Sequence, residues 1–340
     1  AIFFSEGQLI FSGSGYLEVD ANCKAGIRSD DYVRILPKTN IYVDASSGNG
    51  IRGNDAVIVT GGVININITG TADKGISTDG EVRIDGGRTT ILTSGGYEYD
   101  DDDRDYPACS GIKADSLVSI NGGELNIKST GTGGKGINSD DQIVVNDGTV
   151  RIITTGKRQK DSKGSVSPKG IKADGNITFN GGQTQVRLEG SGDGTEAIES
   201  KSEIHIEAGT VECYSYDDAI NSAGNLYIDG GYVYARAMNN DGIDANKNLY
   251  LNGGVVIAEG GQQPECGIDA AEGYSAFING GTVIAVGGGM QAISSSSKQA
   301  CIAVSASLGT TVGVLDGTTA ILGYTMPASN SGTSLMISSP

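Results

Sequence analysis

The chain has 340 residues, 54 of them glycine, and a formal net charge of −17 at pH 7. Nucleic acids and anionic membranes repel so acidic a chain, so neither is expected as a partner. No run of about 18 apolar residues is present, which argues against insertion in a membrane. Glycine at about twice its usual share of roughly 7% indicates many tight corners.

One short phrase recurs along the chain: a small residue, then Ile, then a few polar residues. It first occurs at Gly26 and Ile27, and successive copies lie 22 to 36 residues apart. The other copies begin at Gly50, Gly75, Gly111, Gly136, Gly170, Ala197, Ala219, Gly242, Gly267 and Ala292. Self-similarity at such a period indicates a solenoid.

Each repeat contains short segments in which apolar and polar residues alternate. After Asp115, Val118 and Ile120 alternate with polar residues, and the turn Asn121-Gly122-Gly123 leads into a second alternating segment. Period-two alternation indicates strands, and the glycine pair permits positive φ at the corner. We therefore predict an all-β fold, a single-stranded right-handed parallel β-helix of about 11–12 coils with three strands per coil.

The alignment of repeats predicts interior columns of apolar side chains about 4.8 Å apart. One column should contain Val57, Val82, Val118, Ile143, Ile177, Ile204, Leu226, Leu249 and Ala276. A second should run from Ile64 to Val283, and the Ile of the recurring phrase forms a third. No repeat could bury its apolar face alone, so stacking creates the core.

The repeats divide the chain into three parts. Residues 1–25 are expected to form a partial coil and cap, residues 26–293 the regular coils, and residues 294–340 irregular last coils with a C-terminal cap. Two insertions interrupt the coils just before the recurring phrase, at residues 94–110 and 156–169.

The two insertions carry opposite charge. Residues 97–106 hold six acids and one Arg, a net charge of −5, whereas the second insertion holds five bases and one acid, a net of +4. One coil separates them, so they should emerge about 10 Å apart on the same face and lean together. They are either solvated loops or a wall of a site for an anionic polymer or Ca²⁺.

One outward column changes sign halfway along the predicted helix. Its early members include the candidate substrate-binding residues Arg28, Arg52, Lys113 and Lys172, beside acids two positions further on. The two columns either neutralise each other or form a basic strip for uronic-acid polymers.

The later half carries crowded acidic and amide side chains. The candidate metal ligands are Glu196, Glu199, Asp218, Asn221, Asp241, Asp244 and Asp269. Carboxylates stacked at about 4.8 Å repel one another unless a cation joins them, and hard oxygen ligands suit calcium. The alternative is a solvated acidic edge without metal.

A third outward column ends in three aromatic residues on successive coils, Tyr227, Tyr250 and Phe277. They could bind sugar rings, whose repeat of roughly 5 Å is close to the coil spacing, or they could form a self-stabilising ladder. His205, the only histidine, lies in the same column and is interpreted as a strand surface residue. No residue is assigned a catalytic role.

The five cysteines fit no metal-binding spacing and do not identify a compartment. The chain begins with Ala1 rather than Met, as expected either of a processed secreted protein or of an engineered start. We expect a monomer.

The stretch from Gly170 to Gly182, which reads Gly-Ile-Lys-Ala-Asp followed by a strand and Asn-Gly-Gly, resembles the pectate-lyase-like β-helix family of bacterial carbohydrate-binding domains. The resemblance covers roughly Ala25 to Gly288. It implies a secreted or cell-surface bacterial protein, associated with calcium, that binds plant-type polysaccharides without established catalysis. Family repeats commonly have Asp before Gly-Ile, and only Asp241 matches that form here.

Three functions remain open at this stage. The first is a non-catalytic extracellular protein that binds an acidic or plant-type polysaccharide with the help of calcium. The second is a calcium-dependent polysaccharide lyase, in which Lys113 or Lys172 would act as base, although the predicted metal ligands lie further along the chain. The third is a cell-surface adhesin or structural spacer.

Overall fold

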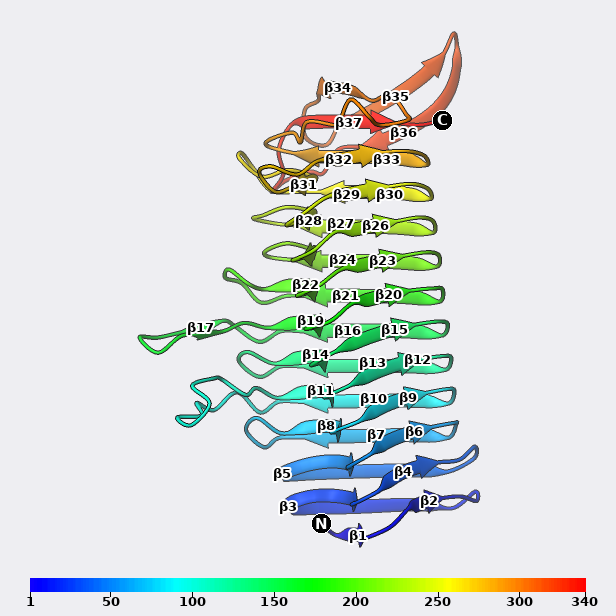
Figure 1. The fold of residues 1–340 in the computed structure, drawn as a ribbon, viewed down its shortest axis with the longest axis vertical. Coiled ribbons are helices and arrows are strands. Elements are labelled where there is room, and N and C mark those ends of the chain that lie inside the picture. The colour runs from blue at the N-terminus through cyan, green and yellow to red at the C-terminus, as the bar shows by residue number, and fades with distance from the viewer.

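The computed structural model describes residues 1–340, apart from the side chains of Asp316 and Ile321. Parallel strands stack into a β-solenoid with the two termini at opposite ends (Figure 1). The all-β prediction is confirmed, and 11 coils are present, as the 11-stranded sheet shows. Among the described residues, no helix has the length and apolar character that crossing a membrane requires.

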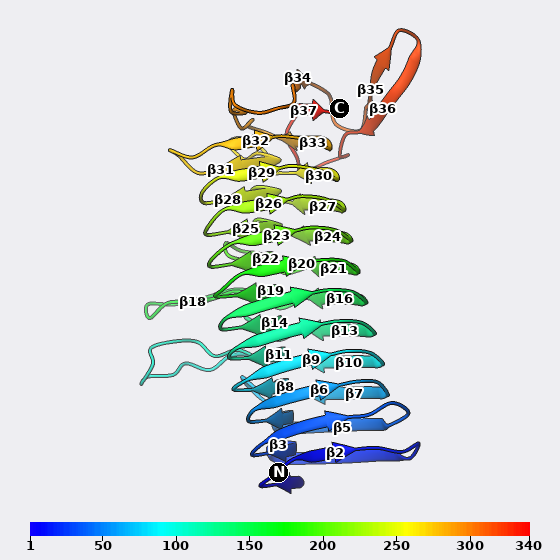
Figure 2. The same cartoon turned by 45° about the vertical axis from the view of Figure 1, so that its right-hand side comes forward.

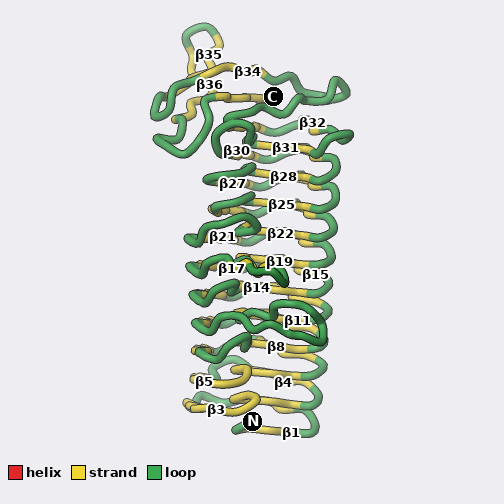
Figure 3. The backbone as a smooth tube through the Cα atoms, turned by 90° about the vertical axis from the view of Figure 1, so that its left-hand side faces the viewer, coloured by secondary structure: helices red, strands yellow, loops and turns green.

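Each coil contains three strands, which we call the A-, B- and C-strand in chain order. The first A-strand, β1 (Phe3–Ser5), precedes the recurring phrase and pairs with its first copy. The later separate A-strands lie at the recurring phrase; they are β8 (Lys74–Thr78), β11 (Ser110–Ala114), β14 (Lys135–Ser139), β19 (Lys169–Ala173), β22 (Glu196–Ser200), β25 (Ile220–Ser222), β28 (Ile243–Ala245) and β31 (Ile268–Ala270). Figure 3 faces these strands, which lie in one column.

The B-strands form the 11-stranded sheet. They are β2 (Leu9–Phe11), β4 (Tyr32–Ile35), β6 (Ala56–Val59), β9 (Glu81–Ile84), β12 (Leu117–Ile120), β15 (Gln142–Val145), β20 (Ile177–Phe179), β23 (Ile204–Ile206), β26 (Leu226–Ile228), β29 (Leu249–Leu251) and β32 (Ala276–Ile278).

The C-strands follow the Gly-Gly corners. They are β3 (Tyr16–Ser29), β5 (Asn40–Gly53), β7 (Val63–Ile68), β10 (Arg88–Thr93), β13 (Glu124–Ser129), β16 (Thr149–Thr154), β21 (Gln183–Leu188), β24 (Thr210–Ser215), β27 (Tyr232–Ala237), β30 (Val255–Glu259) and β33 (Thr282–Gly287). Both β3 and β5 continue through the corner into the next A-strand, so Ile27 pairs with Ile51.

The predicted interior columns are confirmed by strand register. Val82 pairs with Val118 and Val118 with Ile143, and all three are fully buried. Ile112 pairs with Ile137 in the column of the recurring phrase. A single apolar core therefore runs the length of the solenoid, and outward side chains on neighbouring coils form continuous surface columns.

The residue before the Ile of the recurring phrase has little room for a side chain. A Cβ atom on Gly136 would overlap Cγ2 of Ile152 and the carbonyl oxygen of Gly170 on the next coil. In the coil of Ala219, the C-strand residue at the same register is Ala235 in place of a large Ile. A small C-strand residue does not always bring Ala to this position: Gly242 has Ala258 at the same register, and a Cβ there would instead overlap the backbone of Gly267 and Glu259.

The two ends of the solenoid are irregular. At the start, β1 pairs with β3 as the first A-strand, and Phe3 lies edge-on to Phe11 with ring centroids 6.5 Å apart. At the far end, a parallel bridge between Ala276 and Ile293 extends the stack, so the residues that follow Ile293 begin an irregular last coil.

The rest of the tail is antiparallel. Strand β37 (Ser334–Ser338) pairs antiparallel with β33 and with β34 (Ile302–Ser305), and it buries Leu335 and Ile337 against Ile284 and Val286. Strands β35 (Thr311–Asp316) and β36 (Thr319–Thr325) form a hairpin that projects beyond the stack (Figure 2). The tail thus closes the C-terminal end of the core.

Candidate functional site

The A-strands present two outward columns of polar side chains on one face. One column holds the residue before the small residue of the phrase, and the other holds the residue after its Ile. Register confirms the second column from Arg28 to Asp269: Arg28 pairs with Arg52, Lys113 with Asn138, and Lys172 with Glu199. Because the strands are parallel and in register, sign changes in the sequence become sign changes along this face.

The basic half of the face contains a cleft of about 620 Å³. Its floor includes Lys74, Lys113, Lys135, Lys169 and Lys172. Residues of both insertions line its sides, among them Tyr106 and Val166. The insertions, the second of which carries the short strands β17 (Gln159–Lys160) and β18 (Ser165–Val166), project to one side of the stack (Figure 1).

The two insertions contact each other, as their opposite charges predict. Lys163 Nζ lies 3.0 Å from Asp101 Oδ1 and 3.8 Å from the centroid of the Tyr99 ring. The hydroxyl of Tyr106 donates to Asp161, and Tyr106 packs in an apolar cluster with Val166. This contact between loops holds one side of the cleft in place.

Lys135 is the ammonium of the cleft with the least compensation. Among the described residues, no carboxylate oxygen lies within 4.0 Å of its Nζ. Burial, together with the charges of Lys172 and Lys74, lowers the pKa of Lys135 to about 8. The neighbouring Lys74 instead donates to the carbonyl oxygens of Ala72 and Ala108. An anionic group entering the cleft would find an unpaired cation at Lys135.

The four cations proposed from sequence to bind substrate all have acidic partners. Arg28 lies 2.9 Å from Asp30, and Arg52 lies 2.7 Å from Asp79. Lys113 contacts Asp115 and Asp140 at 2.7 and 2.5 Å, and Lys172 lies 2.5 Å from Asp174. Of these four, Lys113 and Lys172 line the cleft, and Arg28 and Arg52 do not. This geometry favours mutual neutralisation for the two arginines.

The change from basic to acidic side chains falls at a buried ionic group. Lys169 Nζ lies 2.6 Å from Glu196 Oε2 and 2.8 Å from Glu199 Oε2. Although burial opposes the charge of both partners, the two carboxylates raise the pKa of Lys169, and Lys169 with Lys201 lowers that of Glu199 to about 2. Glu199, a predicted metal ligand, is therefore held by two ammonium groups.

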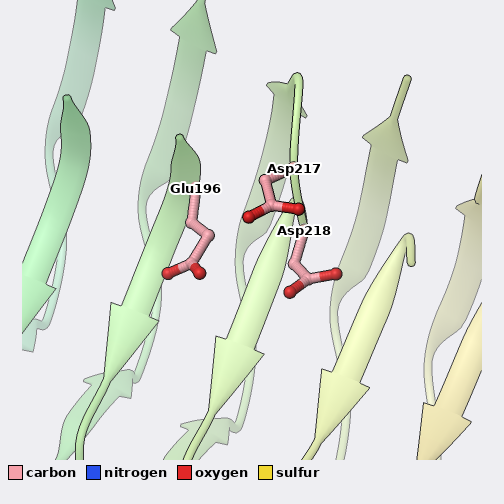
Figure 4. Close-up of side chains that lie close together, drawn as sticks. All are labelled: Glu196, Asp217 and Asp218. Atoms are coloured by element: carbon pink, nitrogen blue, oxygen red, sulfur yellow. The ribbon is translucent and has the colours of Figure 1, made fainter. Parts of the chain in front are cut away.

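The acidic half contains two groups of carboxylates. Glu196, Asp217 and Asp218 form the first, shown in Figure 4, and Asp241, Asp244 and Asp269 form the second. Within each group, one carboxylate oxygen from each residue lies within 4.8 Å of those from the other two.

The remaining predicted ligand, Asn221, lies beside the first group. Its amide donates to Asp218 Oδ2 at 3.1 Å. Asp217 was not among the predicted ligands, although Asp217 and Asp218 are adjacent acids in the sequence.

Burial makes the charged forms of these carboxylates unfavourable. Burial, followed by the charges of Asp244 and Asp217, raises the pKa of Asp218 to about 9. Burial and the nearby Asp269 raise the pKa values of Asp241 and Asp244 to about 7. Burial and mutual repulsion oppose the negative charge of these carboxylates. Their closely spaced oxygen atoms fit the donor set of a divalent hard cation such as Ca²⁺.

The predicted aromatic residues form a ladder on the B-strands that begins with His205. The ring of Tyr227 stacks on Tyr250, and Tyr250 on Phe277, each pair with centroids 4.9 Å apart and planes 7° apart. His205 stacks on Tyr227 at 4.7 Å and lies 3.4 Å from Glu203. Because the inner ring faces cover one another, a sugar could contact mainly their edges, and the geometry favours the self-stabilising ladder.

Lys135 belongs to a surface column that the alignment of the repeats reveals. The repeats do not show which residue of that column is unpaired. The residue before the small residue is Lys74, Lys135 or Lys169 in early coils and Glu196, Asp218 or Asp241 later. Among the described residues, Lys135 differs from Lys169 in having no near carboxylate, and it differs from Lys74 in that Lys74 donates to the carbonyl oxygens of Ala72 and Ala108. Only the folded chain determines that property.

A family model described as carbohydrate-binding domain-containing protein matches residues 1–72, 65–153 and 130–212. Together these matches cover residues 1–212, more than half of the chain and the whole of the basic cleft floor. No curated protein and no solved structure matches the chain significantly.

Proposed function

Because the chain belongs to the family of carbohydrate-binding domain-containing proteins, we propose that it binds an acidic polysaccharide along its A-strand face. The observation that carries this proposal is the unpaired ammonium of Lys135 in a cleft walled by the two insertions. A carboxylate of a uronic-acid residue would form a charge-assisted hydrogen bond with this ammonium. Lys113 and Lys172 flank the cleft and would add charge along the polymer.

Calcium would extend the same site over the acidic half. Asp218, Asp241 and Asp244 with their neighbours would hold the ion, which supplies positive charge where the protein alone presents carboxylates. An anionic polymer crossing Lys169 could then contact cations on both sides. The spacing of coils at about 4.8 Å is close to the roughly 5 Å repeat of a sugar chain, which supports binding parallel to the solenoid axis.

The proposed protein is extracellular or on the surface of a bacterial cell and non-catalytic. Of the two candidate lyase bases, Lys113 lies in β11, three strands before β22, where the first carboxylate group begins. Lys172 lies in the adjacent strand β19, but Asp174 pairs with its ammonium at 2.5 Å. A lyase would need a free base and a metal at one sugar residue, so this arrangement favours binding over elimination.

The test is calorimetric titration with polygalacturonate, in Ca²⁺ and in EDTA, of the wild type and of Lys135→Gln. We expect Lys135→Gln to weaken binding by about tenfold or more, since a hydrogen bond to a charged group contributes about 1.5–3 kcal/mol. The matched control is Lys128→Gln, which removes the same charge from an exposed position on C-strand β13.

Three outcomes would contradict the proposal. Equal weakening by Lys135→Gln and Lys128→Gln would indicate only a general charge effect. No binding in either buffer would leave an adhesin or a structural spacer as the better function. Formation of unsaturated uronides during the titration would instead identify a lyase.

A further inference from the structure

A second groove lies on the outer surface of the C-strands, away from the A-strand face. It has a volume of about 530 Å³ and crosses β16, β21, β24 and β27. One wall consists of Arg151, Gln185, Glu212 and Tyr234, which are in register on successive coils. The other wall consists of Ile153, Arg187, Tyr214 and Arg236, also in register.

The groove is open at one end and bounded at the other by the C-terminal tail. The tail lies over the C-strands of the last coils, where Tyr324 donates to Glu259 Oε1 at 2.6 Å. Its contact nearest to the groove is the bond from Arg236 Nη2 to the carbonyl oxygen of Ser329, at 3.1 Å. The coils before Arg236 leave the same face uncovered, and Ile153 exposes 39% of its surface there.

The charges of the groove are balanced within the protein. Arg151 lies 3.3 Å from Glu124, Arg187 3.2 Å from Glu189, and Arg236 3.4 Å from Glu259. Gln185 donates to Glu212 Oε2 at 2.6 Å.

These pairs distinguish the groove from the basic cleft. An anionic ligand would have to compete with carboxylates already in place, whereas Lys135 has no such partner. Uncharged hydroxyl groups, however, can use the guanidinium donors and carboxylate acceptors that remain free in such pairs.

The shape of the groove suits an extended chain of sugar rings. Four coils in register span about 14 Å, the length of about three residues of a chain with a repeat of roughly 5 Å. The apolar surfaces of Ile153, Tyr214 and Tyr234 can cover the C–H faces and edges of sugar rings. The guanidinium, amide and carboxylate groups of the groove line it beside them. The ring of Tyr214 is held by the guanidinium of Arg187, 4.4 Å from its centroid.

We propose that this groove is a separate binding site for an uncharged polysaccharide chain, independent of calcium. The groove shares no side chain with the acidic-polysaccharide site and is proposed in addition to it. With both sites, one molecule could hold an acidic and a neutral polysaccharide on two faces.

The experiment is calorimetric titration, in EDTA, with cellohexaose, xylohexaose and mannohexaose as neutral probes. At least one should bind the wild type. Tyr214→Ala should weaken that binding about tenfold and Gln185→Ala about fivefold, while both leave binding of polygalacturonate in Ca²⁺ within twofold. Gln142→Ala is the matched control for Gln185→Ala, because Gln142 is exposed like Gln185 but lies on B-strand β15, away from the groove.

The inference is overturned if none of the three probes binds the wild type, or if a probe binds and neither groove variant weakens it. It is also overturned if hexagalacturonate alone binds and Tyr214→Ala weakens it. Circular dichroism of each variant shows whether the fold is intact, and Gln185→Ala provides a test should Tyr214→Ala misfold. The neutral probes test the groove and polygalacturonate tests the acidic site, so a failure of one proposal can be distinguished from a failure of the other.

Discussion

Lys169 Nζ lies 2.6 Å from Glu196 Oε2, and this contact joins the basic and acidic halves of one protein face. The two residues are register partners on adjacent coils, and both are buried. A second carboxylate, Glu199, completes the group at 2.8 Å. The junction compensates charge that burial would otherwise make costly.

Glu199→Gln should therefore destabilise the protein. Removing one partner of a buried ion pair costs about 3–5 kcal/mol, because it leaves charge without compensation. Chemical denaturation at pH 7 measures the change. The control is Glu189→Gln, whose exposed pair with Arg187 should contribute at most about 1 kcal/mol.

The same variant predicts a pH dependence. The pKa of Glu199 is about 2 in the folded protein, below its ordinary value of 4.5, so its stabilisation is present above about pH 4.5. It is lost as the pH falls toward 2. The difference in free energy of unfolding between wild type and Glu199→Gln should shrink over this range, and a constant difference would contradict the assignment.

Calcium should raise the thermal stability of the wild type. Asp218 has a pKa of about 9, against an ordinary value of 3.8, so without a cation the folded state loses stability as the pH rises between these values. At a concentration 100 times its Kd, a bound ion would add about 2.7 kcal/mol. Differential scanning fluorimetry in EDTA and in Ca²⁺ measures both effects.

Asp218→Asn and Asp244→Asn should abolish the calcium-dependent shift. In EDTA at pH 7, Asp218→Asn should raise the stability above that of the wild type, because the wild-type carboxyl must take up a proton on folding at this pH and the amide need not. Asp102→Asn, at an exposed position in the first insertion, is the control. An undiminished calcium shift in both acidic-edge variants would place the ion elsewhere.

Binding of polygalacturonate should weaken as the pH rises through about 8. The pKa of Lys135 is about 8 in the free protein, below its ordinary value of 10.5, so the ammonium that attracts the polymer is present below this pH and lost above it. Titrations between pH 6.5 and 9.5 would measure the effect, because this range extends roughly 1.5 pH units to each side of that pKa. Lys135→Gln should bind weakly and nearly independently of pH, and a wild-type slope retained by that variant would exclude Lys135 as its source.

Gly136→Ala should destabilise the solenoid by about 1–3 kcal/mol, the usual cost of overpacking a core. The added methyl group would overlap Ile152 and the backbone of the next coil. The reverse change, Ala219→Gly, faces the smaller Ala235 and should cost no more than about 1 kcal/mol. Urea denaturation compares the two, and similar losses would mean that side-chain size at this corner is not limiting.

The sequence by itself determined the fold and the surface columns. Ile at every copy of the phrase and alternation on both sides of the Gly-Gly corners specify which side chains face inward, because strand geometry has period two and the repeat sets the register. The stacking of Val82, Val118 and Ile143 could therefore be predicted from the sequence alone. The attraction between the two insertions followed in the same way from their charges.

Only the tertiary structure decided which members of each column are available to a ligand. Lys169 and Lys135 occupy the same column and look alike in the sequence, but Glu196 lies 2.6 Å from the first, and no carboxylate of the described residues lies within 4.0 Å of the second. Likewise, Tyr250 has its ring faces covered by its neighbours on adjacent coils. Pairing and burial depend on distances of a few ångströms between residues 20 or more positions apart, and a repeat pattern fixes the column but not those distances.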